Sequence, residues 1–331
     1  MSNLVTKKLF RRIATVFRFS LVGFFILILL AGFRLYLISN SNAENPIFTN
    51  GDLQMYMLDV GQGDSFVLLQ DDKAMLVDAG PLYNWNKTNK ELKKLGVKKL
   101  DYVVITHYHQ DHAGGLYSVL FNYKVEKLII PDMSTFHARY SDLFYHCINF
   151  TTRFENEISG GEMIEFAEKG DKFKFANSEV NFLSPIEDYY ENLNNYSLVM
   201  KVTYNDIDIL LTGDMEKEVE NELLDSGTDV SADVYKAAHH GSCTSNSSEF
   251  LEAVNPQYVL ISSNNGEKNL YGHPIKRFMN YLESKDIDVY RTDEQGTIKM
   301  TTDGKNVEFD CEKADYKSGM EYLGTVREMQ K

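Results

Sequence analysis

Short apolar runs separated by polar turns dominate this chain of 331 residues and predict a sheet-rich fold. Residues 53–58, 66–69 and 74–77 are three such runs joined by short turns, a pattern typical of an antiparallel start to a sheet. Residues 102–105 (Tyr-Val-Val-Ile) predict a buried parallel strand. Further strands are expected at 125–130, 173–175, 180–183, 198–203, 207–211, 234–238, 258–262, 289–290 and 297–300. Helices are expected at 87–95, 134–157, 216–226 and 275–284, and from Leu116 onward.

The amino-terminal 38 residues have a different pattern. Residues 7–18 are basic and amphipathic, and residues 19–38 are apolar except for Arg34. Their length matches the roughly 20 residues that span a bilayer, and an Arg near one end reaches the interface. Basic residues before the span keep the amino end in the cytoplasm and place the rest outside the cell. The alternative is a signal peptide cleaved near Ala43, followed by secretion. The predicted segments are a cytoplasmic part (1–18), a membrane anchor (19–38), a linker (39–51), a globular domain (52–310) and a polar tail (311–331).

Charge and cysteine content narrow the function classes. Six of the 34 basic residues and none of the 48 acidic ones lie in residues 1–43, so the rest of the chain has a balance of −20. Tight binding of long nucleic acids relies on Lys and Arg, so DNA is disfavoured as a partner but remains open. The three cysteines, Cys147, Cys243 and Cys311, form no paired motif, which argues against a disulfide framework or thiolate cluster.

Four metal-binding side chains follow the strand at 102–105. They are His107, His109, Asp111 and His112, and they include three of the eight histidines in the chain. A loop at the carboxyl end of a strand is where open α/β sheets bind ligands. Imidazole and carboxylate groups suit Zn²⁺ and similar divalent ions. The alternative, a polar surface loop rich in histidine, explains this concentration less well.

Two later strand ends carry the same residue types. Asp214 follows the strand at 207–211 in the sequence Thr-Gly-Asp; alternatively, it caps the helix that begins at Glu216. His239 and His240 follow the strand predicted at 234–238. The carboxyl ends of three strands therefore supply candidate metal ligands.

The order His-x-His-x-Asp-His, with Thr-Gly-Asp about 100 residues later, resembles the metallo-β-lactamase superfamily. Residues 53–301 are similar to one branch, the hydrolase domain of the competence DNA-uptake channel ComEC and its free-standing relatives. The motifs that carry this similarity are residues 59–65 (DVGQGDS), 78–80 (DAG), 195–199 (NYSLV), 239–242 (HHGS) and 269–274 (NLYGHP). Phosphorylcholine esterase is more distantly similar. Because one span is predicted, a DNA-transport role is not expected.

The resemblance implies an α/β fold, a four-layer αββα sandwich, and two divalent ions, Zn²⁺ or Mn²⁺. It implies that His107 and His109 bind one ion, that Asp111 and His112 bind the other, and that Asp214 bridges them. His240 is expected to complete the second site, with His239 as proton donor; the reverse assignment stays open.

The first site has no further histidine in the expected position. His137 and His146 are interpreted as surface or packing residues. Residues 194–197 (Asn-Asn-Tyr-Ser) occupy the place of the missing ligand, so a water or an asparagine oxygen is expected there. Asp78 is expected to orient the histidine loop. The remaining candidates for orienting ligands or contacting substrate are Asp64, Asn195, Ser197, Ser242 and His273.

The expected activity is a phosphodiesterase or nuclease-like hydrolysis with Asp111, Asp214 and His239 as catalytic residues. Two ions lower the pKa of a bridging water and hold phosphoryl oxygens, and His239 would protonate the leaving oxygen. The expected partners are therefore a phosphodiester-containing substrate and the membrane; the sequence does not indicate an oligomeric state. Alternatives are a phosphorylcholine esterase-like enzyme on envelope polymers, a hydrolase of carbon esters, thioesters or lactams, and a non-catalytic envelope interaction module.

Overall fold

Two β-sheets lie face to face in the computed structural model, which describes Gly32 and residues 44–132, 163–264, 269 and 271–312. The first sheet has the strand order β15-β14-β1-β2-β3-β4-β5-β6. Its strands are β1 Leu53–Met57, β2 Phe66–Gln70, β3 Lys73–Val77, β4 Lys99–Val104, β5 Lys124–Pro131, β6 Ile164–Ala167, β14 Ile298–Thr302 and β15 Val307–Cys311. The second sheet has the order β13-β12-β11-β10-β9-β8-β7. Its strands are β7 Lys172–Phe175, β8 Ser178–Ser184, β9 Val199–Tyr204, β10 Ile207–Leu211, β11 Val234–Lys236, β12 Tyr258–Ile261 and β13 Asp288–Arg291.

Most interior strands are apolar on both faces because each sheet is covered on both sides. Successive side chains of a strand point to opposite faces. In β2, Phe66 and Leu68 pack into the core between the sheets, whereas Val67 packs into the outer core of the first sheet. In β10, Leu211 faces the core between the sheets and Leu210 faces the outer core of the second sheet.

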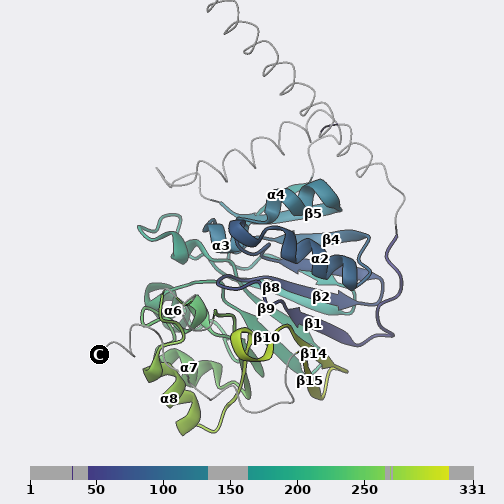
Figure 1. Cartoon of the computed structure of the whole chain (residues 1–331). Coiled ribbons are helices and arrows are strands. Elements are labelled where there is room, and N and C mark those ends of the chain that lie inside the picture. Colours follow the sequence, from purple (N-terminus) through teal and green to yellow (C-terminus); the bar gives the residue numbers. More distant parts are fainter. Residues whose placement is uncertain (1–31, 33–43, 133–162, 265–268, 270, 313–331) are drawn as a thin grey trace, which may run out of the picture. The chain divides into compact units, whose positions relative to one another are not determined.

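Helices cover the outer faces of both sheets (Figure 1). The first sheet is covered by α2 Asn86–Lys94 and α4 Leu116–Asn122, and the second by α6 Lys217–Asp225, α7 Ser248–Val254 and α8 Lys276–Ser284. Helix α8, for example, buries the apolar stripe formed by Phe278, Met279 and Leu282. The predicted α/β class and the four-layer αββα arrangement are confirmed.

Each sheet has an antiparallel part and a parallel part. β1, β2 and β3 pair antiparallel, as predicted, and β4 runs parallel to both β3 and β5. In the second sheet, β10 to β13 are parallel neighbours. The loops after β3, β4, β10, β11 and β12 therefore follow carboxyl ends of parallel strands, where α/β sheets place their sites.

Several elements differ from the sequence prediction. The strand predicted at 234–238 ends at Lys236, because the next residues form the short helix η3 Ala238–Gly241, in which His239 and His240 have φ of 49° and 55°. Strands β6 and β15 and helix α7 were not predicted. The remaining short helices are η1 Leu82–Asn84, α3 Gln110–Ala113, η2 Leu193–Tyr196 and α9 Thr292–Gln295. Helix α3 shows that Asp111 and His112 lie on a helical turn and not on an open loop.

Some predictions fall on residues outside the described ranges. These are the anchor at 19–38 apart from Gly32, the helix at 134–157 with His137 and His146, and the tail beyond Glu312. Among the described residues, no helix has both the length and the apolar character needed to cross a bilayer. Residues 44–51 of the predicted linker pack against the domain, because Asn45 accepts hydrogen bonds from the backbone of Lys98 and Lys99 (2.9 and 3.1 Å).

Candidate metal centre

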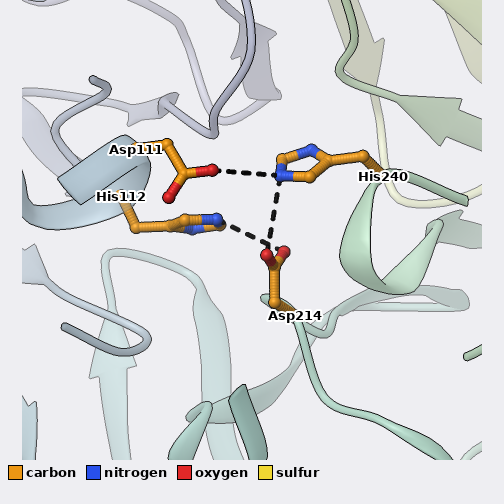
Figure 2. A group of neighbouring side chains, drawn as sticks. All are labelled: Asp111, His112, Asp214 and His240. Atoms are coloured by element: carbon orange, nitrogen blue, oxygen red, sulfur yellow. Dashed lines mark ion pairs between the residues drawn. The ribbon is translucent and has the colours of Figure 1, made fainter. Parts of the chain in front are cut away.

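Four side chains from both sheets converge at the carboxyl ends of the strands (Figure 2). Asp111 and His112 lie on α3 after β4, Asp214 follows β10, and His240 follows β11. One ligand atom from each lies within 4.8 Å of all the others. The Nε2 atom of His112 is 3.3 Å from Asp214 Oδ1, and the Nε2 atom of His240 is 3.6 Å from Asp214 Oδ2 and 3.8 Å from Asp111 Oδ2.

These four residues suit a divalent metal ion. Tetrahedral ligands at about 2.0–2.1 Å from zinc lie roughly 3.3 Å apart, close to the observed spacings. Within the described part of the chain, three buried atoms here have no hydrogen-bond partner: His112 Nε2, Asp214 Oδ1 and His240 Nε2. Buried polar atoms are nearly always satisfied, so such a group of them points to a bound ion.

The two carboxylates of this group are ionised. Burial alone would raise the pKa of Asp214, but the charges of His112 and His240 hold it well below its ordinary value. Burial also opposes ionisation of Asp111, but the neighbouring His240 and His112 lower its pKa. Both side chains therefore present negative oxygens to a cation.

The two imidazoles of the group are fixed from behind. His112 donates from Nδ1 to Asp78 Oδ2 (2.7 Å), and His240 donates from Nδ1 to the Ser262 carbonyl (3.1 Å). In the neutral imidazole that binds a metal, these hydrogen bonds select the tautomer that leaves Nε2 free. The structure thus places Asp78 behind the metal ligands, at the position expected for an orienting residue.

His107 and His109 form a second pair of donors beside the first group. His107 Nε2 lies 3.0 Å from His109 Nδ1 and 4.0 Å from Asp214 Oδ2. Burial lowers the pKa of both imidazoles, most strongly that of His107, which favours the neutral form that binds metals. Asp214 is therefore the side chain common to both groups.

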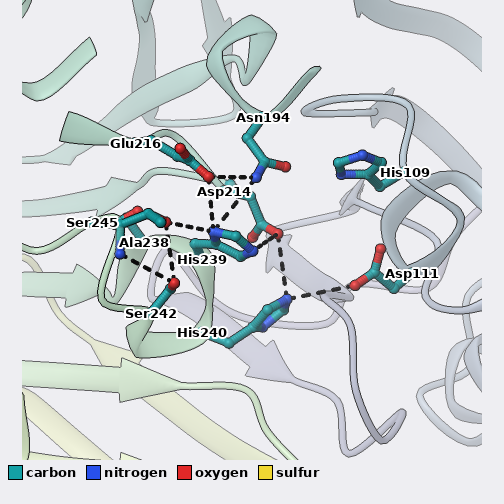
Figure 3. A network of polar contacts seen from close by, with 12 residues as sticks. His109, Asp111, Asn194, Asp214, Glu216, Ala238, His239, His240, Ser242 and Ser245 are labelled. Carbon is teal, nitrogen blue, oxygen red and sulfur yellow. Dashed lines mark hydrogen bonds and ion pairs between the residues drawn. The ribbon is translucent and has the colours of Figure 1, made fainter. Parts of the chain in front are cut away.

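His239 lies between Glu216 and Asp214, next to His240 (Figure 3). Its side chain is 23% exposed, compared with 1% for His240, so His240 is the residue enclosed with the other donors. The Nδ1 atom of His239 is 3.4 Å from Glu216 Oε1, and its Nε2 is 3.8 Å from Asp214 Oδ2. Burial opposes protonation of His239, but the charges of Asp214 and Glu216 raise its pKa above the ordinary value.

A buried ion pair lies behind the metal ligands and was not predicted from the sequence. Lys236 Nζ is 2.8 Å from Asp64 Oδ2, and it also donates to the carbonyls of Ala237 (2.9 Å) and Gly213 (3.3 Å). The other Asp64 oxygen accepts a hydrogen bond from the Ser262 hydroxyl. Both carboxylate oxygens of Asp64 are thus engaged by protein groups. A lysine at the end of a buried strand was the one signal in the sequence that pointed to this pair.

Three other predicted residues support the loops of the site. The Ser197 hydroxyl accepts a hydrogen bond from the Asp214 backbone N–H (3.0 Å), and the Asn195 amide oxygen accepts one from the Glu216 N–H (3.0 Å). The Ser242 hydroxyl is 3.1 Å from that of Thr244, which in turn lies 3.2 Å from His239 Nδ1. These contacts engage the side chains in shaping the turns that carry Asp214 and His239.

His273 faces the site from another loop. Its ring centroid lies 5.4 Å from that of His239. Burial and the neighbouring His240 and His239 lower the pKa of His273 to about 4. It is therefore neutral near pH 7.

The backbone around the site is tightly packed. Gly63 has a φ of 134°, and a Cβ there would lie 2.2 Å from the carbonyl oxygen of Asp111. Gly213 has a φ of 51°, and a Cβ there would lie 2.9 Å from both Thr106 and Ser197. His239 and His240 also have positive φ, a strained conformation that concentrates at functional sites.

Comparison with known proteins agrees with this geometry. The model of the family described as "Metallo-beta-lactamase superfamily" matches residues 58–263. ComE operon protein 3 of Bacillus subtilis (strain 168) is 31% identical over 261 residues, which are 73% of this chain and 32% of that protein. Competence protein ComA of Neisseria gonorrhoeae is 28% identical over 244 residues, 73% of this chain and 31% of that protein. The chain thus spans about a third of the length of these relatives.

Among solved structures, Tm1679, described as a metal-dependent hydrolase of the beta-lactamase superfamily, is similar with a TM-score of 0.46 and 16% identity. The similarity covers 72% of this chain and 95% of Tm1679.

Proposed function

Because this chain belongs to the metallo-β-lactamase superfamily, whose fold it has, we propose that it is a metal-dependent hydrolase that cleaves phosphodiester bonds. The observation that carries the proposal is the placement of His239. This histidine of raised pKa stands at the open edge of a cluster of metal donors, beside the shared carboxylate of Asp214. A proton donor next to a metal centre suits phosphodiester hydrolysis, because the metal can activate water and the donor can protonate the leaving oxygen.

The roles of the residues follow from their contacts. Divalent ions, when bound, activate water for attack and neutralise phosphoryl charge. Asp111, His112, Asp214 and His240 would hold one ion, and His107 and His109 would hold a second with Asp214. Either Zn²⁺ or Mn²⁺ suits these nitrogen and oxygen donors.

His239 would act as the general acid. Its Nδ1 lies against the Glu216 carboxylate and the Thr244 hydroxyl, so the ring is fixed with Nε2 toward Asp214. Because its pKa is raised, the ring is protonated over more of the neutral pH range than an ordinary histidine. It can therefore transfer a proton from Nε2 to the oxygen that leaves phosphorus.

The charge of the chain favours a small or isolated phosphodiester over long DNA. The balance of −20 beyond residue 43 repels a polyanion except at the metal centre. The apolar segment at 19–38, preceded by basic residues, supports a membrane-anchored enzyme with its site outside the cytoplasm. We therefore include membrane anchoring and an extracytoplasmic site in the proposed function.

A phosphorylcholine esterase-like activity is the second candidate, and exposed aromatic side chains favour it. Tyr271 is 59% exposed and stacks on His273, which lies next to His239. Tyr83 is 66% exposed, and its hydroxyl accepts a hydrogen bond from the Gln62 N–H beside the site (3.1 Å). Aromatic faces bind quaternary ammonium groups through cation–π attraction.

The test is hydrolysis by the purified full chain, loaded with Zn²⁺ or Mn²⁺. Three substrates separate the candidates: bis(p-nitrophenyl) phosphate, single-stranded DNA and p-nitrophenyl phosphorylcholine. We expect turnover of the first that falls at least about 100-fold in Asp214→Ala and His109→Ala, because ligand loss exceeds the 10–100-fold effect of supporting residues. Preferential turnover of p-nitrophenyl phosphorylcholine would instead identify the second candidate.

The matched control is Asp225→Asn, which changes an exposed aspartate at the end of α6. It should retain wild-type turnover. Full activity in both Asp214→Ala and His109→Ala, with the control also active, would refute the metal-dependent mechanism.

A further inference from the structure

We propose that the side-chain oxygen of Asn194 completes the first metal site together with His107, His109 and Asp214. Asn194 lies in η2, between β8 and β9 of the second sheet. The inference rests on the proposed metal-dependent function, because it assigns a ligand to the less complete of the two donor groups. At position 194 the chain has an asparagine amide and not a histidine imidazole.

The side-chain oxygen of Asn194 is buried and makes no hydrogen bond in the described structure. The residue is 5% exposed, and Oδ1 has no hydrogen-bond partner within the described ranges. The other polar atoms are engaged: the backbone N–H donates to Asn192 Oδ1 (3.1 Å), and Nδ2 donates to Glu216 Oε1 (3.0 Å). Buried acceptors are nearly always satisfied, so this oxygen calls for a donor or a cation.

The neighbouring Glu216 determines the orientation of the Asn194 side-chain amide. Asn194 Nδ2 lies 3.0 Å from Glu216 Oε1, and a carboxylate oxygen accepts hydrogen bonds from an amide NH₂ group. The NH₂ group of Asn194 must therefore face Glu216, and the oxygen must point the other way. In Figure 3 the oxygen is turned toward the side on which His109 lies.

The groups on the side that the Asn194 oxygen faces are themselves electron-pair donors. His107 Nε2 and His109 Nδ1 lie 3.0 Å apart, about the spacing of two ligands on one ion. The Nδ1 atom of His107 is turned to the Thr106 hydroxyl (3.2 Å), which leaves its Nε2 lone pair toward the site. Asp214 adds a carboxylate oxygen 4.0 Å from His107 Nε2. A cation satisfies such a set, including the Asn194 oxygen.

The assignment has a consequence for metal preference. Two imidazoles, one carboxylate and one carboxamide give the first site two nitrogen and two oxygen ligands. Carbonyl and carboxylate oxygens suit Mn²⁺ better than an additional imidazole would. The first site should therefore accept Mn²⁺ readily, and Asn194→Asp should retain it because an oxygen remains at the same position.

The experiment measures metal content and affinity in the full chain, apart from activity. Metal-free protein is titrated with Mn²⁺ by calorimetry, and bound ions per chain are counted by elemental analysis after gel filtration. Wild type should bind two ions. Asn194→Ala should lose one, with an affinity drop of at least about 100-fold at that site, while the second ion stays. Asn194→Asp should keep both.

The matched control is Asn280→Ala, which removes an exposed amide on α8 and should bind two ions. Two ions bound by Asn194→Ala with wild-type affinity, or a single ion bound by wild type, would overturn the assignment. If Asn194→Ala does not fold, as judged by circular dichroism, loss of one ion in the oxygen-retaining Asn194→Asp would overturn it as well. Wild type that binds two ions but cleaves no phosphodiester would refute the proposed function and leave the ligand assignment intact.

Discussion

Asp78 shows how one carboxylate orients two histidines. It accepts hydrogen bonds from His112 Nδ1 (2.7 Å) and the Thr106 hydroxyl (2.8 Å) on the same oxygen, and from the Thr106 N–H on the other (2.8 Å). Because the Thr106 hydroxyl donates to Asp78, it is left to accept from His107 Nδ1 (3.2 Å). Asp78 therefore fixes His112 directly and His107 through Thr106, which leaves both Nε2 atoms facing the site.

The buried hydroxyl of Tyr123, away from the metal centre, should make the stability of the protein depend on pH. Burial raises the pKa of Tyr123 to about 12, and its hydroxyl donates to the Asn89 carbonyl (3.2 Å). A raised pKa means that the folded state favours the protonated form. The associated stability is therefore complete below the unfolded pKa of about 10 and is lost as the pH rises toward 12.

The measurement is the free energy of unfolding in urea between pH 8 and pH 12. Relative to Tyr123→Phe, wild type should lose on the order of 2–3 kcal/mol across this range, since each pKa unit corresponds to about 1.4 kcal/mol. At pH 8 the variant should be less stable by about 1 kcal/mol because it lacks the hydrogen bond. Parallel pH profiles for the two proteins would contradict the assignment.

At the scale of elements, helix α7 depends on its first turn. The Ser247 hydroxyl accepts a hydrogen bond from the Phe250 N–H (3.2 Å) and caps the helix. Glu220 of α6 accepts from the N–H groups of Asn246 and Ser247, which ties the two helices together. Ser247→Ala should therefore lower the free energy of unfolding by about 1 kcal/mol.

Chemical denaturation in urea tests this prediction. Ser248→Ala is the matched control, since its hydroxyl contacts only the neighbouring Glu249 side chain in the described structure (3.2 Å). The control should change stability by less than about 0.5 kcal/mol. Equal losses in the two variants would show that the cap contributes nothing specific.

The sequence predicts elements well where an apolar run is long and bounded. β2, β3, β4 and β10 are of this kind, and each was located within a few residues. β15 was missed because its residues are intermediate or exposed throughout, as at a sheet edge. α7 was missed although Ser247 and the spacing of Phe250, Leu251 and Val254 were available as signals.

Site residues could likewise be predicted where they form a short local motif, but not where their role depends on residues far apart in the sequence. The motif at 107–112 and the two later strand ends are short and contiguous, so their residues could be listed from the sequence. The contacts of Asp64 could not, because its partner Ser262 is 198 residues away. Only the order of strands in the second sheet brings Lys236, Ser262 and Asp214 to one edge.

At the scale of the whole molecule, the metal centre joins the two sheets. Asp111 and His112 follow β4 of the first sheet, whereas Asp214 and His240 follow strands of the second. An ion bound by all four links the halves of the sandwich. Removing it with a chelator should therefore lower the melting temperature.

The size of the shift follows from binding linkage. At a free ion concentration 1,000 times the Kd, binding stabilises the folded state by about 4 kcal/mol, or roughly 10 °C for a domain of this size. Thermal unfolding with EDTA, and again after Mn²⁺ or Zn²⁺ is restored, measures it. Asp214→Asn should show little response to either addition. If EDTA did not change the wild-type melting temperature, a stabilising link between the two sheets through a bound ion would be ruled out.

The hydrogen bonds behind the candidate metal ligands have a consequence for the cost of binding an ion. Asp78, Ser262 and Ser197 hold His112, His240 and Asp214 in place through contacts made entirely by the protein. The orientation of these donors is therefore set by the chain's own residues. Because the three side chains are already held in place, binding an ion would cost them little conformational entropy.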